Sequence, residues 1–375
     1  MTQDRPARRQ WTGFVIGLLV VALPLIGYLV LRSDGRGPKP KPPATAPAPS
    51  TPAAAPPTFP IDDAAFPPSG MSVPDEEGPI DPAALRRALE RTEGWLDRFQ
   101  IDPFGGVGTD SLRLFTLQIE SFHRLWWSER DPARRAARGE RVRAMLERAL
   151  AADRLRETLR MQGSTQGVYE IILLCARGEE HGVDVAPVLP VIRSILPILQ
   201  TEIDRMPPSA AAMYVSALGR IGIDAQRPIA RYRSSGILSK RPREVNMSLR
   251  DIYALTQEIL AYTDGGVAPL EGLSPDERRY LARVLPYFAM AYTLFRRSEL
   301  VGDLLSCLSG AELKETYGYR EAMRTLLARQ NPDGSFGELP EESAGGSDNP
   351  SQRLAATASC VTALCIERKS AGEGS

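Results

Sequence analysis

Polar and aromatic residues that could bind or cleave a ligand occur in two stretches of the chain. His123 and Trp126 lie three residues apart, and Tyr253, Gln257 and Glu258 form the second stretch. A spacing of three to four residues places side chains on one side of a helix. Carboxyl and amide groups beside aromatic rings are typical of sites that bind or cleave glycans. These residues are therefore candidate cavity or ligand contacts, and core packing or surface charge is the alternative interpretation.

A basic segment from Arg227 to Arg250 is the second candidate site. It contains seven basic residues and one acidic residue, Glu244. Such a segment could bind anionic lipid head groups or an acidic polymer. The alternative is a solvated loop that neighbouring acidic helices neutralise. The candidate contacts with an anionic partner are Arg231, Arg233, Lys240, Arg241 and Arg243.

The cysteines and histidines indicate neither a metal site nor a cofactor. The four cysteines show no CxxC spacing, and each lies in an apolar run. We expect them to be buried free thiols. The chain has only two histidines, and no cysteine pairs with either of them at a metal-binding spacing. The cysteines are Cys175, Cys307, Cys360 and Cys365.

Charge balance bears on the class of partner. Lys plus Arg and Asp plus Glu both number 46, so the formal net charge is zero. Binding to nucleic acid requires a positive field over the phosphates. We therefore expect no nucleic-acid partner.

The elements that position these residues follow from the apolar and proline patterns. Residues 1–10 form a basic tail, and residues 11–31 contain no charge. As a helix, this uncharged run spans ~32 Å, which matches the hydrocarbon core of a bilayer. The sequence predicts a single-pass, uncleaved anchor in the cell membrane, a Pro- and Ala-rich linker over 32–78, and an extracytoplasmic domain over 79–375.

The domain is predicted to be all-α and built from helical hairpins. Asp81 followed by Pro82 is typical of a helix start, and Leu85, Leu89 and Leu96 then form one apolar face. No segment shows the alternation expected of a half-buried strand. The later helices are expected at about 109–127, 131–160, 164–178, 185–205, 208–221, 247–263, 274–297, 299–309, 317–330 and 350–369.

One turn motif narrows the architecture. Residues 330–337 read Gln-Asn-Pro-Asp-Gly-Ser-Phe-Gly between two apolar helices. We expect Gly334 and Gly337 to make sharp bends, Phe336 to be buried and Ser335 to face solvent. The segment resembles the Q-x-x-D-G-S-F-G repeat of α/α-toroid proteins, the superfamily of terpene cyclases, protein prenyltransferases and thioester-type complement domains. That resemblance implies a full or partial ring of hairpins whose inner helices line a central cavity.

The chain departs from the enzymes of that superfamily. It has no D-x-D-D segment, no D-D-x-x-D helix, no recognisable zinc set and no C-G-E-Q-like motif. The activities of those enzymes are therefore not expected here. Two functions remain open. The domain is either a membrane-anchored binding or scaffold module or a hydrolase or lyase that acts on envelope polysaccharide in a toroid cavity.

Overall fold

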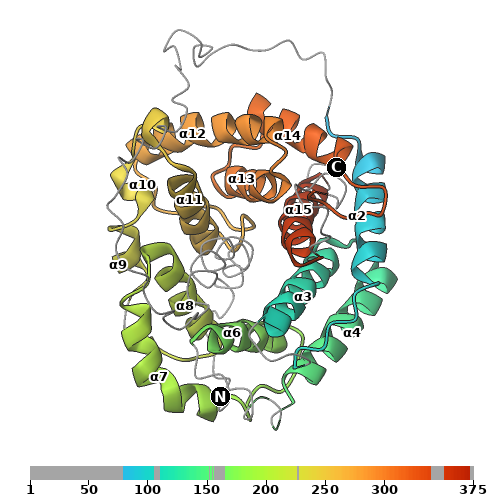
Figure 1. The fold of residues 1–375 in the computed structure, drawn as a ribbon, viewed down its shortest axis with the longest axis vertical. Coiled ribbons are helices and arrows are strands. Elements are labelled where there is room, and N and C mark those ends of the chain that lie inside the picture. The colour runs from blue at the N-terminus through green and yellow to red at the C-terminus, as the bar shows by residue number, and fades with distance from the viewer. Residues whose placement is uncertain are drawn as a thin grey trace, which may run out of the picture. The chain divides into compact units, whose positions relative to one another are not determined.

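The computed structural model describes residues 79–104, 110–151, 153, 155, 165–225, 228–338 and 350–371 (Figure 1). The predicted anchor over 11–31 and linker over 32–78 lie outside these ranges. No helix in the described ranges is both long enough and apolar enough to cross a membrane.

The described part of the chain is all-α, as the sequence predicts, and it contains no strand. The helices are α2 (Pro82–Leu96), α3 (Asp110–Ser128), α4 (Pro132–Ala149), α6 (Thr165–Glu180), α7 (Leu189–Ile203), α8 (Pro208–Arg220), α9 (Ala230–Arg233), α10 (Ile237–Lys240), α11 (Leu249–Tyr262), α12 (Pro275–Leu294), α13 (Ser298–Gly310), α14 (Tyr317–Ala328) and α15 (Pro350–Ser370), with a 3₁₀ helix η2 (Glu244–Asn246) before α11.

Local capping explains where several helices begin. The Asp81 carboxylate accepts hydrogen bonds from the first backbone N–H groups of α2, and proline occupies the first position of that helix. Ser248 and Asp251 form a capping box at α11. Ser274 and Glu277 form another at α12. These starts are set by residues within one turn of the helix end.

Two expectations about secondary structure need correction, one for a helix and one for a loop. The segment predicted as helix over 131–160 is interrupted, because α4 ends at Ala149 and Leu150 leaves helical geometry. Leu150 is buried and packs toward Gly178 of α6, so tertiary packing ends a helix that local propensity would extend. The basic segment is also more ordered than a loop. It contains α9, α10 and η2, which are too short to produce a periodic apolar pattern.

Some of the helices pack in a closed cycle, and we call them the inner helices. Each contacts the next, and the last returns to the first. The remaining long helices α2, α4, α7, α12 and α14 pack outside them (Figure 1). The order around the cycle is α3, α6, α8, α11, α13 and α15.

Pairs of side chains show that neighbouring inner helices run parallel. From α3 to α6 and from α8 to α11, the earlier residue on one helix meets the earlier residue on the next, and the later residue meets the later one. The N-terminal turns of these helices therefore lie at one end of the cycle and the C-terminal turns at the other. The pairs are Glu120 with Arg177, His123 with His181, Ser209 with Gln257, and Arg220 with Asp264.

The motif at residues 330–337 forms a tight turn directly after α14, in the chain segment that leads to α15. Gly334 and Gly337 have φ of 95° and 102°, as predicted, and Phe336 is fully buried. A Cβ on Gly334 would lie 2.3 Å from the Arg91 carbonyl oxygen of α2. The expectation that Ser335 faces solvent is wrong. Ser335 is buried because its hydroxyl donates to the Asp333 carboxylate and accepts from the Asn331 amide.

Candidate functional site

Three carboxyl groups lie in the N-terminal turns of the inner helices, and we call them the acidic cluster. Glu170 belongs to α6, and Glu299 and Asp303 belong to α13. Glu170 and Asp303 are each only 3% exposed. Within the described part of the chain, one carboxyl oxygen of each of the three is buried without a hydrogen-bond partner. Leaving buried acceptors unsatisfied costs free energy, so this arrangement is not explained by stability.

Burial controls the charge state of the acidic cluster. Desolvation raises the pKa of Glu170 and that of Glu299 to about 7 in each case. Desolvation, together with the neighbouring Glu299, raises the pKa of Asp303. At neutral pH the cluster therefore contains both protonated and ionised carboxyl groups, which can donate as well as accept hydrogen bonds.

Arg113 of α3 connects the two sides of the acidic cluster. Its charge acts on both Glu170 of α6 and Glu299 of α13 and favours their ionised forms. Helix α15 separates α3 from α13 in the cycle, so one guanidinium can act on both helices only from the interior or from the end of the cycle. The cluster therefore lies either inside the cycle or at the end where these helices begin.

Tyrosines accompany these carboxyl groups. The rings of Tyr169 on α6 and Tyr214 on α8 have centroids 4.2 Å apart. Burial raises the pKa of Tyr253 on α11, and Glu299 and Asp303 add to that shift. Aromatic faces beside hydrogen-bonding groups suit a ligand with both apolar faces and hydroxyl groups.

A second polar region lies in the C-terminal turns of the inner helices, and we call it the arginine network. The Arg177 guanidinium donates to Glu120 over 2.9 Å and to Glu180 over 2.6 Å. Arg220 donates to Glu180 over 3.2 Å and to Asp264 over 3.3 Å. The network contains three arginines and three carboxylates, namely Glu120, Arg124, Arg177, Glu180, Arg220 and Asp264.

Pairing maintains the charge of Arg177 despite burial. Burial alone would lower the pKa of Arg177, but Glu120 and Glu180 raise it. Arg124 also donates to the Asp264 backbone carbonyl over 2.8 Å, which joins α3 to the end of α11. The network therefore fastens the C-terminal ends of α3, α6, α8 and α11 together.

Helix dipoles favour part of this division of charge. The N-terminal end of a helix carries partial positive charge and the C-terminal end partial negative charge. Glu299 occupies the first turn of α13 and Glu170 the second turn of α6, whereas Arg177 and Arg220 occupy last turns. The backbone therefore stabilises the charges of Glu299 and the two arginines, whereas Glu180 and Asp264 lie at C-terminal ends that disfavour negative charge.

The structure separates the candidate residues of the first stretch from most of those of the second. His123 Nδ1 lies 3.0 Å from His181 Nε2, and the Trp126 ring centroid lies 4.5 Å from that of His181, beside the arginine network. Burial lowers the pKa of His123, and burial lowers that of His181 to about 4. Both imidazoles are therefore neutral at pH 7. Tyr253 lies on the N-terminal side, next to the acidic cluster.

Gln257 and Glu258 are adjacent in sequence but contact different elements. Gln257 accepts a hydrogen bond from Ser209 of α8 over 3.2 Å. The Glu258 carboxylate accepts from the Leu238 backbone N–H over 3.0 Å, and desolvation raises its pKa to about 7. A Cβ on Gly236 would lie 2.1 Å from Glu258 Oε1, so the Glu258 carboxylate packs directly against Gly236. Glu258 thus anchors the segment that contains α10.

The candidate anionic-partner contacts differ in their surroundings. Arg233 is half-buried, and its guanidinium donates to the Glu271 carbonyl over 2.7 Å. Arg241 lies 3.6 Å from Asp276. Arg231, Lys240 and Arg243 are exposed. Acidic residues at the start of α12 therefore neutralise part of the segment.

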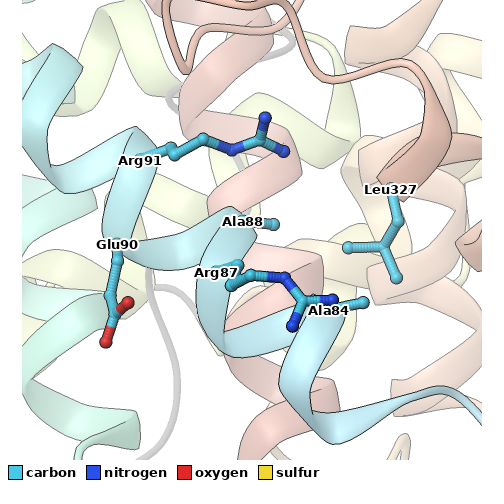
Figure 2. Close-up of a pocket in the computed structure, with 6 residues that line it drawn as sticks. All are labelled: Ala84, Arg87, Ala88, Glu90, Arg91 and Leu327. Atoms are coloured by element: carbon cyan, nitrogen blue, oxygen red, sulfur yellow. The ribbon is translucent and has the colours of Figure 1, made fainter.

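A groove of about 510 Å³ lies between α2 and α14, and no residue of either polar region lines it. Figure 2 shows Arg87 and Arg91 extending from α2 toward Leu327, whereas Glu90 points away. None of the candidate residues lines this groove.

The described residues contain no group of three His, Cys, Asp or Glu side chains that could hold a metal ion. The four cysteines are free and buried, as the sequence predicts.

Sequence reasoning missed the acidic cluster and most of the arginine network. A usable indication was present, because Glu170 and Asp303 are single charges inside the apolar runs 168–174 and 300–305. A lone charge on the apolar face of a buried helix requires either a partner or a function. The helices that provide the partners lie far apart in sequence, so pairing could not be read from spacing.

Comparison with known proteins identifies a family. No curated protein and no solved structure matches this chain. One family model, described as "Domain of unknown function (DUF6895)", matches residues 85–361. That range includes both polar regions up to α15 and most of the chain. This chain therefore belongs to the DUF6895 family.

Proposed function

We propose that this protein is a membrane-anchored binding module with an α/α-toroid fold and that its ligand is a glycan bound at the acidic cluster. The anchor is the uncharged segment 11–31, and the domain that begins at residue 79 is extracytoplasmic. The Pro-rich linker over 32–78 separates the two.

Helix packing supports the toroid part of the proposal. In an α/α toroid, parallel inner helices form a closed cycle, and outer helices connect them. The packing order from α3 through α15 and back to α3 agrees with that arrangement. The turn at 330–337, with Phe336 buried beneath it, also agrees with the toroid repeat.

The single observation that carries the function is the set of unpartnered, buried carboxyl oxygens in the acidic cluster. Within the described residues, Glu170, Glu299 and Asp303 each retain hydrogen-bonding capacity. A glycan presents many hydroxyl groups to such oxygens, and its apolar faces can stack on the neighbouring tyrosines. The formal charge of zero makes a nucleic-acid ligand a poor alternative.

Calorimetric titration tests the proposal. The full chain, held in lipid nanodiscs, is titrated with fragments of envelope polysaccharides. Glu170→Gln and Glu299→Gln are expected to weaken binding by roughly tenfold or more, because each removes an acceptor that can carry charge. Glu147→Gln, an exposed change on α4, is the matched control and should leave affinity unchanged. Failure of all fragments to bind, or equal binding by every variant, would overturn the proposal.

A specific observation favours an enzyme as the second candidate. The pKa values of Glu170 and Glu299 are both raised to about 7. Carboxyl groups with such values can act as the general acid and the general base in the hydrolysis or elimination of a glycan.

Product analysis separates the two candidates. A hydrolase would release reducing ends from the bound polysaccharide, and a lyase would release unsaturated sugars. Glu170→Gln or Glu299→Gln would reduce either activity by 10²–10⁴-fold. Binding without turnover would leave the binding module as the function.

A further inference from the structure

The turn from α12 to α13 exposes large apolar side chains, and we call Met290, Leu294 and Phe295 the apolar tip. Leu294 is 79% exposed, Phe295 61% and Met290 37%. Scattered apolar residues on a surface are ordinary, but these three lie within two turns of chain and meet at one helix end. Their exposure therefore indicates a surface that a binding partner covers.

The apolar tip is held in a defined position. The Arg329 guanidinium donates to the Thr293 carbonyl at the base of the tip, which joins α12 to α14. The Tyr292 ring has its centroid 6.0 Å from that of Phe295. Packing from two sides keeps the tip directed outward.

Two arginines, Arg296 and Arg297, directly follow the tip, and both are exposed. Apolar side chains next to arginine match the two layers of a membrane interface. The apolar groups enter the acyl boundary while the guanidinium groups meet anionic head groups.

The chain itself indicates a bilayer as the occupant. Outside the described structure, the sequence carries the uncharged run 11–31, followed by the linker 32–78. A domain tethered in this way stays at high effective concentration near the bilayer, so a small docking surface is sufficient. A second copy of the chain is the competing occupant.

We infer that the apolar tip docks onto the surface of the bilayer that anchors this protein, with Arg296 and Arg297 on anionic head groups. The inference rests on the proposed anchor over 11–31. Glu299 follows Phe295 by four residues at the start of α13, so docking brings the acidic cluster close to the membrane.

Site-specific fluorescence on the reconstituted full chain tests this inference. Phe295→Cys carries an environment-sensitive fluorophore, and the native cysteines do not compete because they are buried. Leu294→Cys provides a second probe position. Tyr317→Cys is the matched control, because Tyr317 is 43% exposed and follows the opposite end of α13. The vesicles contain either phosphatidylcholine alone or equal parts of phosphatidylcholine and phosphatidylserine.

Docking predicts a blue shift at 295 and quenching by brominated lipid, both larger in the anionic vesicles and both absent at 317. If the chain sediments with the vesicles but the probe at 295 remains water-exposed, docking is wrong and the anchor stands. If the chain does not sediment with the vesicles at all, both proposals are overturned. A shift that follows protein density and not lipid composition identifies a second copy as the occupant and also overturns docking.

Discussion

The arginine network and the acidic cluster lie on the same inner helices but treat their charges differently. On α6, Glu170 and Arg177 are seven residues apart, which is ~10 Å along a helix. Arg177 donates to two carboxylates, although one of its own nitrogens and one Glu120 oxygen also lack a hydrogen-bond partner among the described residues. Glu170 likewise keeps a buried oxygen without a partner there, and desolvation outweighs the charge of Arg113 on it. The difference separates two roles. Paired charges fix the ends of the helices, and unpartnered groups reduce stability unless a ligand uses them.

The largest expected effect comes from breaking the arginine network. Arg177→Met should lower the free energy of unfolding by about 3–5 kcal/mol, because Glu120 would remain buried, and Glu180 half-buried, with less compensation. Chemical denaturation measures the change. Arg143→Met, in an exposed pair with Glu147, is the control and should cost no more than about 0.5 kcal/mol. Equal effects in the two variants would show that the network contributes no more to stability than an exposed ion pair does.

Phe336→Ala provides an apolar reference for that loss. Phe336 is fully buried in the connection between α14 and α15. Its truncation should cost about 3–5 kcal/mol, since it removes a buried ring and leaves a cavity. The same denaturation experiment gives the value. A loss below about 1 kcal/mol would contradict the packing of this connection.

Glu170→Gln should raise the free energy of unfolding, whereas the two preceding substitutions should lower it. Desolvation raises the pKa of Glu170 in the folded state from 4.5 to about 7, so the folded protein holds the proton more tightly than the unfolded chain does. The stability of the native sequence should therefore fall as pH rises from 4.5 to 7. The variant should be more stable than the native sequence by about 1–3 kcal/mol at pH 8 and similar to it at pH 4. Destabilisation at pH 8 would indicate that Glu170 is paired after all.

The histidine pair should give the smallest effect on stability, and that effect should appear at acidic pH. Burial lowers the pKa of His123 and that of His181, the latter from 6.5 to about 4. As pH falls, the unfolded chain therefore binds protons at a higher pH than the folded protein does. Stability should fall as pH drops from 6.5 toward 4. His123→Gln should reduce that fall while leaving stability at pH 8 nearly unchanged. Thermal unfolding across this pH range measures it, and an unchanged slope would rule out His123 as its source.

The sequence determined the local features. The Asp81 cap, the turn at 330–337, the buried cysteines and most helix ranges follow from interactions within a few residues. The end of α4 at Ala149 did not follow, because Leu150 meets Gly178 only in the folded chain. The burial of Ser335 was missed although its partners Asn331 and Asp333 lie within four residues of it.

Only the tertiary structure decided which charges are paired. Arg124 and Asp264 are separated by 140 positions in sequence, and they meet because α3 and α11 end on the same side of the cycle. His123 and Tyr253, grouped as candidates by residue type, lie instead on opposite sides. Spacing within a helix determines which side chains share a face. The register between helices, which packing sets, determines whether a buried carboxylate meets an arginine or remains available to a ligand.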